Sequence, residues 1–160
     1  MRRLVGLWTV VGFLVFLHFL LHVGLGLERG APDLLTVALL LAVREVGPGT
    51  AAGIGFSFGL MEDAFSVLAF GGNALAMTLI AVLGSFTRDL FVGETVRFYI
   101  LYLVFGKWAR DALFWVVAGE GVQGPAVRSL LVQAPVAALY AALVGTGLLV
   151  LNQRIREREA

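Results

Sequence analysis

Hydrophobic positions along the chain fall into six apolar segments, which are separated by short clusters of glycine, proline and charged residues. The segments cover about residues 4–27, 33–43, 49–70, 74–92, 95–118 and 126–151. A helix rises about 1.5 Å per residue and the hydrocarbon layer of a membrane is about 30 Å thick, so about 20 apolar residues cross it. We therefore predict six helices. The second, DLLTVALLLAV, is short enough to be a half-span or a tilted helix, which leaves a five-span arrangement open.

The composition is typical of an integral membrane protein. Of the 160 residues, 59% are hydrophobic and 14% are charged, and the mean hydropathy is +0.92. A soluble domain contains about 25% charged residues and lacks repeated apolar runs of this length. The sequence contains no cysteine, which excludes disulfides, iron–sulfur clusters and thiolate chemistry. Because the connections are short, we expect one compact all-α membrane domain over residues 1–160, with about six transmembrane helices in a bundle.

The distribution of arginine predicts the orientation, since cytoplasmic loops of membrane proteins carry an excess of positive charge. With a cytoplasmic amino terminus and six crossings, only Arg29 and Arg128 fall on the outer side. The inner side then receives Arg2, Arg3, Arg44, Arg88, Arg97, Arg154, Arg156 and Arg158. We therefore expect a multi-pass protein with both termini in the cytoplasm, in contact with membrane lipid at the inner surface.

Ionisable residues inside three of the predicted spans form the main candidate site. At about 1.5 Å per residue, four of them lie about 18–22 Å above the inner boundary of the membrane. These four are His18, Asp63, Lys107 and Arg110. An unpaired charge at this depth costs about 2.5–3.5 kcal/mol, so such groups normally face the interior of the bundle and pair. We therefore expect these side chains to meet.

The spacing of the charges predicts their pairing. Lys107, Arg110 and Asp111 share one face of a helix because they are three and four residues apart. We predict an ion pair between Lys107 and Asp111, and a second pair between Arg110 and Asp63 of another span, because the arginine fork matches a carboxylate. Two interpretations stay open: a buried ion pair that sets the register of the helices, or a pocket for a ligand or an ion.

Small residues repeat every four positions in the third segment and lead to a carboxylate. The stripe consists of Ala51, Gly55, Gly59 and Asp63. Stripes of this kind let two helices approach closely in lipid. The neighbouring Glu62 lies about 100° further round the helix. The spacing therefore predicts that Asp63 faces a tightly packed helix, whereas Glu62 faces another gap that water can enter.

The sequence carries no motif of an enzyme. P-loop, zinc-protease and nucleophile-elbow motifs are absent, so we expect no catalytic residue, no cofactor and no nucleic-acid partner. His18 and His22 are four residues apart, a spacing that can hold a metal ion. Because the sequence contains no other histidine and no cysteine, we expect hydrogen bonding by these rings instead of a metal site.

Residues 30–90 resemble the MreD family of rod-shape-determining membrane proteins. The family pattern has a Pro-Asp pair before an apolar second span, a third span of the form G-F-x-x-G-L-x-x-D, a glycine turn and an apolar fourth span. The matching residues are Pro32, Asp33, Gly55, Phe56, Gly59, Leu60, Asp63, Gly71 and Gly72. Two features depart from this pattern, the additional acid Glu62 and the charged trio Lys107, Arg110 and Asp111.

This resemblance implies a non-enzymatic protein of the bacterial inner membrane that supports lateral peptidoglycan synthesis and cell shape. The implied partners are MreC, which is the most direct one, RodA, a class B penicillin-binding protein and the MreB cytoskeleton. The family is also similar in fold to the S components of energy-coupling-factor vitamin transporters. A second hypothesis is therefore a transporter subunit that binds a small solute near Glu62, Asp63 and Arg110, and a third is a proton-coupled permease that depends on Asp63.

Overall fold

The chain is helical throughout the residues that the structure describes. The computed structural model describes residues 2–26, 31–65, 70–87, 96–118 and 129–159. Its α-helices are α1 (Arg2–Phe19), α2 (Leu34–Val43), α3 (Pro48–Asp63), α4 (Gly72–Phe86), α5 (Val96–Ala118) and α8 (Ala134–Glu159). Two π-helical turns, η1 (Leu20–Gly24) and η2 (Ser129–Gln133), extend α1 and precede α8. The predicted all-α fold is confirmed, and no strand occurs within these ranges.

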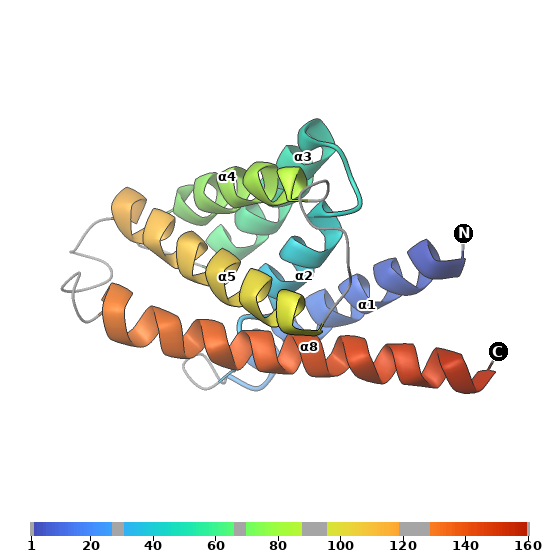
Figure 1. Ribbon diagram of the computed structural model, residues 1–160. Helices are drawn as coiled ribbons and strands as arrows, with labels where there is room; N and C mark the ends of the chain where they lie inside the picture. Colours follow the sequence, from blue (N-terminus) through green and yellow to red (C-terminus); the bar gives the residue numbers. More distant parts are fainter. Residues whose placement is uncertain (1, 27–30, 66–69, 88–95, 119–128, 160) are drawn as a thin grey trace.

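The short second helix lies at the centre of the molecule. All ten residues of α2 are buried, and α1, α3, α4, α5 and α8 each contact it (Figure 1). A helix that is apolar on every side must be covered on every side. At about 1.5 Å per residue, α2 extends only about 15 Å. It is therefore an enclosed core helix, and the other helices surround it.

The third helix ends earlier than its apolar segment predicts. We expected a helix as far as residue 70, but α3 ends at Asp63. The Asp63 carboxylate binds the first turn of α4, and Gly71 adopts a φ of +90° just before that helix begins. Glycine is the residue that takes this left-handed conformation without a steric penalty. The chain therefore reverses here, and α3 and α4 pack side by side (Figure 1).

Two helical stretches are long and apolar enough to cross a membrane. These are Gly6–Gly24, in α1 and η1, and Leu130–Gly147, in η2 and α8. α2 and α4 are apolar but shorter. By length and composition, the described helices thus provide two crossing segments, and the six predicted spans are not confirmed.

The first helix begins and the last helix ends on the same side of the molecule (Figure 1). An even number of crossings requires this arrangement. The orientation predicted from charge depends in part on Arg29, Arg88 and Arg128, which lie outside the described residues.

Apolar side chains fill the interior and also cover much of the surface. Leu14, Leu34 and Leu40 are at most 1% exposed in the core, whereas Phe16 and Phe65 are each 63% exposed on the outside. An extended apolar surface marks contact with a membrane or with another protein. Charged side chains show the opposite distribution, since several of them are buried at the centre of the bundle.

Candidate functional site

The small-residue stripe of α3 packs directly against α4, as predicted. Ala51, Gly55, Gly59 and Asp63 are the buried residues of α3. A Cβ atom added to Gly55 would lie 2.5 Å from the carbonyl oxygen of Met77, and one added to Gly59 would overlap the backbone at the start of α4. The two glycines therefore bring the helix axes close enough for Asp63 to reach the end of α4.

Asp63 caps the amino end of α4. Its Oδ2 accepts hydrogen bonds from the N–H groups of Gly71 and Ala74, both at 2.9 Å, and its Oδ1 accepts one from the Asn73 N–H at 3.1 Å. The first N–H groups of a helix have no partner within the helix, and a negative charge there also interacts favourably with the helix dipole. The side chain is almost fully buried, at 1% exposure.

This cap corrects the predicted ion pair between Asp63 and Arg110. Asp63 does face a tightly packed helix, but the backbone of that helix satisfies its carboxylate. It is not the direct partner of Arg110. The hypothesis of a permease that depends on Asp63 receives no support from this geometry, because both carboxylate oxygens already accept hydrogen bonds.

Replacing Asp63 by alanine is expected to lower the free energy of unfolding by about 2–3 kcal/mol, because buried N–H groups of α4 lose their acceptor. Asp63→Asn is the matched control. Asparagine keeps one acceptor oxygen in the same place, so about half of the loss is expected. Unfolding by sodium dodecyl sulfate in mixed micelles, followed by circular dichroism, measures both variants. Equal stability of Asp63→Ala and the natural protein would contradict the capping role.

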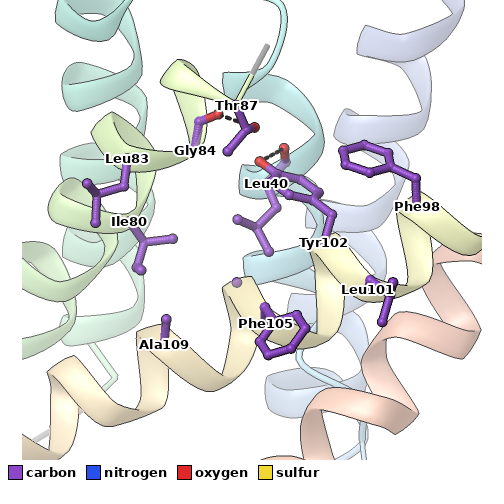
Figure 2. Close-up of a pocket in the computed structure, with 11 residues that line it drawn as sticks. Leu40, Ile80, Leu83, Gly84, Thr87, Phe98, Leu101, Tyr102, Phe105 and Ala109 are labelled. Carbon is purple, nitrogen blue, oxygen red and sulfur yellow. Dashed lines mark hydrogen bonds between the residues drawn. The ribbon is translucent and has the colours of Figure 1, made fainter. Parts of the chain in front are cut away.

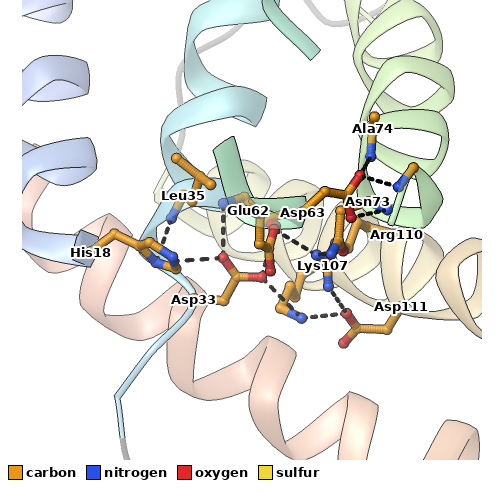
Figure 3. Close-up of polar contacts among 12 residues, drawn as sticks. His18, Asp33, Leu35, Glu62, Asp63, Asn73, Ala74, Lys107, Arg110 and Asp111 are labelled. Carbon is orange, nitrogen blue, oxygen red and sulfur yellow. Dashed lines mark hydrogen bonds and ion pairs between the residues drawn. The ribbon is translucent and has the colours of Figure 1, made fainter. Parts of the chain in front are cut away.

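Five other charged residues, together with His18 and Asn73, form a connected network across five helices (Figure 3). Lys107 of α5 lies between two carboxylates: it pairs with Asp111 of its own helix and with Asp33 at the start of α2, where the Nζ–Oδ2 distance is 3.2 Å. The predicted pair between Lys107 and Asp111 is thereby confirmed. Asp33 also caps α2, since its carboxylate accepts the N–H and the hydroxyl of Thr36.

Arg110 connects α5 to α3 and α4. Its Nη2 donates to Oε2 of Glu62 at 2.7 Å and to the side-chain oxygen of Asn73, and its Nη1 donates to Asp111 at 3.1 Å. The carboxylate on another helix that pairs with Arg110 is therefore Glu62, not Asp63. Glu62 lies on the side of α3 away from the packing stripe, as predicted, and its side chain is 25% exposed.

His18 joins the network at its edge. The Leu35 N–H donates to its Nδ1 at 3.3 Å, and the same nitrogen is 4.0 Å from Oδ1 of Asp33. A ring nitrogen that accepts a hydrogen bond carries no proton, so His18 is neutral in this arrangement. His22 stacks on it with 4.1 Å between the ring centroids, and its Nδ1 lies 3.0 Å from the carbonyl oxygen of His18. Both rings thus take part in hydrogen bonds, as expected.

Sequence reasoning missed two members of the network, Asp33 and Asn73. A usable signal for Asp33 was present, because an aspartate directly before an apolar run is a typical helix cap. No comparable signal marked Asn73, which only the packing of α4 against α5 brings to Arg110.

A polar cavity of about 710 Å³ lies beside the network. Its wall includes both histidines of α1 and η1, together with side chains from the start of α2 and from α3, α5, η2 and α8. The polar and charged lining residues are His18, His22, Asp33, Glu62, Lys107, Gln133 and Tyr140. Arg110 and Asp111 are not among the residues that line it. The predicted gap next to Glu62 is therefore a real cavity.

A second cavity, of about 450 Å³, lies between α4 and α5 and is almost wholly apolar (Figure 2). Leu83, Leu101 and Phe105 stand on its rim and are 57–64% exposed. Two glycines, Gly84 and Gly106, form part of its wall, and Cβ atoms added to them would lie within 3.0 Å of side chains of α2. We refer to this cavity as the α4–α5 groove.

Comparisons with protein-family models, with curated proteins and with solved structures find no match for this chain. The fold and the site define its class: an all-helical bundle with a buried network of charged side chains beside a polar cavity. A fold of this kind does not by itself determine a function, which depends on the site.

Proposed function

We propose that this chain is a six-span subunit of the bacterial inner membrane with both termini in the cytoplasm, and that it acts without enzymatic activity in the cell-elongation complex. In this role it binds MreC and supports lateral peptidoglycan synthesis by RodA and a class B penicillin-binding protein, along the MreB cytoskeleton. The proposal follows the resemblance to the MreD family.

The proposal is supported by where the structure places the residues that match the MreD pattern. Gly55 and Gly59 lie against α4, and Asp63 caps α4. Asp33 caps α2, and Gly71 provides the left-handed turn. The family pattern therefore corresponds to one packed unit, α2–α3–α4, in which each of these residues has a structural role.

A membrane environment is supported by the distribution of side chains. Large apolar residues such as Phe16, Phe56 and Phe65 are more than half exposed, while Lys107 and Arg110 are buried and paired. A charged residue inside a membrane normally faces the interior of the bundle and pairs there. Two stretches of spanning length add to this argument.

The α4–α5 groove is the surface that best fits a partner helix. It is apolar, and it is open at the outer face of the two helices. An apolar helix can lie in such a groove. We therefore assign this groove to the single membrane span of MreC.

A photo-crosslinking amino acid at Leu83 or Leu101 is expected to trap MreC in cells that express this protein with its elongation complex. Both positions lie on the rim of the groove and are exposed. Phe13 and Phe16 of α1 are matched controls, since they are equally exposed apolar positions outside the groove. Capture of no member of the complex from the rim, or equal capture from α1, would contradict the proposal.

The polar cavity favours a second candidate function, that of a subunit which binds a small solute, as in S components. Its volume of about 710 Å³ lies within the range of about 300–1,000 Å³ that is typical of ligand sites. The cavity also has a charged wall and is separate from the α4–α5 groove. Binding of a solute to the purified protein is the observation that this candidate requires.

A further inference from the structure

We propose that the polar cavity binds a small organic cation through a primary ammonium or guanidinium group. This inference is independent of the binding of MreC. It rests on the second candidate function, namely that the cavity holds a solute, and it specifies the chemical class of that solute.

The network beside the cavity contains more carboxylates than cations. Three carboxylates, from Asp33, Glu62 and Asp111, surround only two cations, Lys107 and Arg110. His18 accepts a hydrogen bond at Nδ1 and is neutral, so it supplies no further positive charge. Asp63 is not part of these ion pairs, because its carboxylate oxygens accept hydrogen bonds from backbone N–H groups at the start of α4. Asp33 is counted because it pairs with Lys107 in addition to capping α2. The ion pairs thus contain one carboxylate more than cations, and this excess lies beside the cavity.

An uncompensated charge in a water-poor interior is costly, so a positive group from outside the network is strongly favoured next to it. An anion has no such place, because Lys107 is the cation on the cavity wall and already contacts the carboxylates of Asp33 and Asp111. Arg110, which does not line the cavity, contacts Asp111, Glu62 and the amide of Asn73. A bound anion would have to displace a partner of Lys107.

The wall of the cavity provides further groups for such a ligand. Glu62 is the carboxylate of the network with the most exposed side chain, at 25%. Gln133 and Tyr140 line the cavity, and both residues are exposed. An amide oxygen and a phenol oxygen accept hydrogen bonds from an ammonium group, and the phenol ring attracts a cation to its face.

The size of the cavity and its titratable groups determine the kind of cation. About 710 Å³ is far more than a metal ion fills, and no cluster of three metal-ligating side chains occurs in the described parts of the chain. The titratable side chains on the wall are His18, His22, Asp33, Glu62, Lys107 and Tyr140. Since Lys107 repels a second cation, we expect the ligand's positive group to bind Glu62, with its apolar part against Val132 and Val136, which also line the cavity.

Three probes of similar length and different charge test the inference. They are agmatine, which carries a guanidinium and an ammonium group, adipate, which carries two carboxylates, and uncharged hexane-1,6-diol. The full-length protein is placed in nanodiscs of phosphatidylcholine, which lacks a primary amine, and titrated with each probe by isothermal calorimetry. We expect saturable binding of agmatine and none of adipate or hexanediol up to millimolar concentration.

Two variants assign the binding to the cavity. Glu62→Gln is expected to weaken agmatine binding by about tenfold to hundredfold, as loss of a charge-assisted hydrogen bond does. Gln133→Leu lies outside the charge network and is expected to weaken binding by a few-fold without affecting the fold. Glu45→Gln is the matched control, because it removes the same charge from an exposed position and should leave binding unchanged.

The outcomes separate this inference from the function on which it rests. If adipate or hexanediol binds as well as agmatine, the cavity does not prefer a cation. If Glu62→Gln and Gln133→Leu both bind agmatine normally, the cation does not bind at the proposed place. Either result contradicts the cation site and leaves the proposal of a solute site standing. If no probe binds, both are contradicted. If agmatine binds, the titration is repeated in nanodiscs that contain phosphatidylethanolamine, a lipid with a primary amine. Weaker agmatine binding in these nanodiscs indicates that the natural ligand is a lipid headgroup. Unchanged binding indicates a free solute.

Discussion

Gly59→Ala is expected to lower the free energy of unfolding by about 3 kcal/mol, the upper end of the cost of overpacking a close helix contact. A Cβ atom at Gly59 would overlap the backbone of Asn73 and Ala74. Backbone atoms cannot turn aside as a flexible side chain can, so α3 and α4 have to separate. This separation also weakens the three hydrogen bonds from α4 to Asp63.

Gly53→Ala is the matched control for this variant. Gly53 lies on the same helix, but a Cβ atom there meets no other atom within 4 Å. Alanine favours a helix over glycine by about 1 kcal/mol, so this variant is expected to be as stable as the natural protein or slightly more stable. Unfolding in mixed detergent micelles compares the two. A similar loss for both glycines would show that the close contact of α3 and α4 does not determine stability.

Arg110→Met is expected to lower the free energy of unfolding by about 3–5 kcal/mol, the cost of breaking a buried ion pair on one side. The arginine side chain is 7% exposed and pairs with both Glu62 and Asp111. Methionine fills similar space but leaves Glu62 without a cation. Asp111 keeps Lys107, so most of the loss arises at Glu62.

A double-mutant cycle tests this assignment. Adding Glu62→Gln to Arg110→Met removes the unpaired charge, so the double variant is expected to be more stable than the sum of the single losses predicts, by about 1–3 kcal/mol. Glu45→Gln with Arg110→Met is the control cycle, and its effects should add to within about 0.5 kcal/mol. Additive losses for Glu62 and Arg110 would contradict a direct pair.

Local patterns were sufficient to predict six helical segments, although α3 ends before its apolar segment does and α8 continues beyond its own. The segment around α2 is apolar at almost every position, and α2 is buried along its whole length. The four-residue repeat on α3 correctly identified the face that packs against a neighbour, because residues four apart lie on one side of any helix. Lys107 and Asp111 pair for the same reason.

The choice of partners between helices could not be predicted in this way. The predicted depth in the membrane put both Asp63 and Glu62 at the level of Arg110. Helical periodicity correctly predicted that the two acids point in different directions. The error came from treating side chains as the only partners. A buried carboxylate can be satisfied equally well by the backbone N–H groups at the start of another helix, and α4 begins at that place.

Hydrophobic spacing along this chain thus determines its helical content and the packing face of α3, since both depend only on the regular geometry of a single helix. Tertiary structure decides that α2, which was predicted as a half-span or a tilted helix, is enclosed by the other helices. Tertiary structure alone decides that Asp63 caps α4, that Glu62 receives Arg110 and that Asp33 and Asn73 join the network. It also creates the polar cavity beside them. These features depend on which helix ends and side chains meet across the bundle, and such contacts follow from the packing of several helices at once.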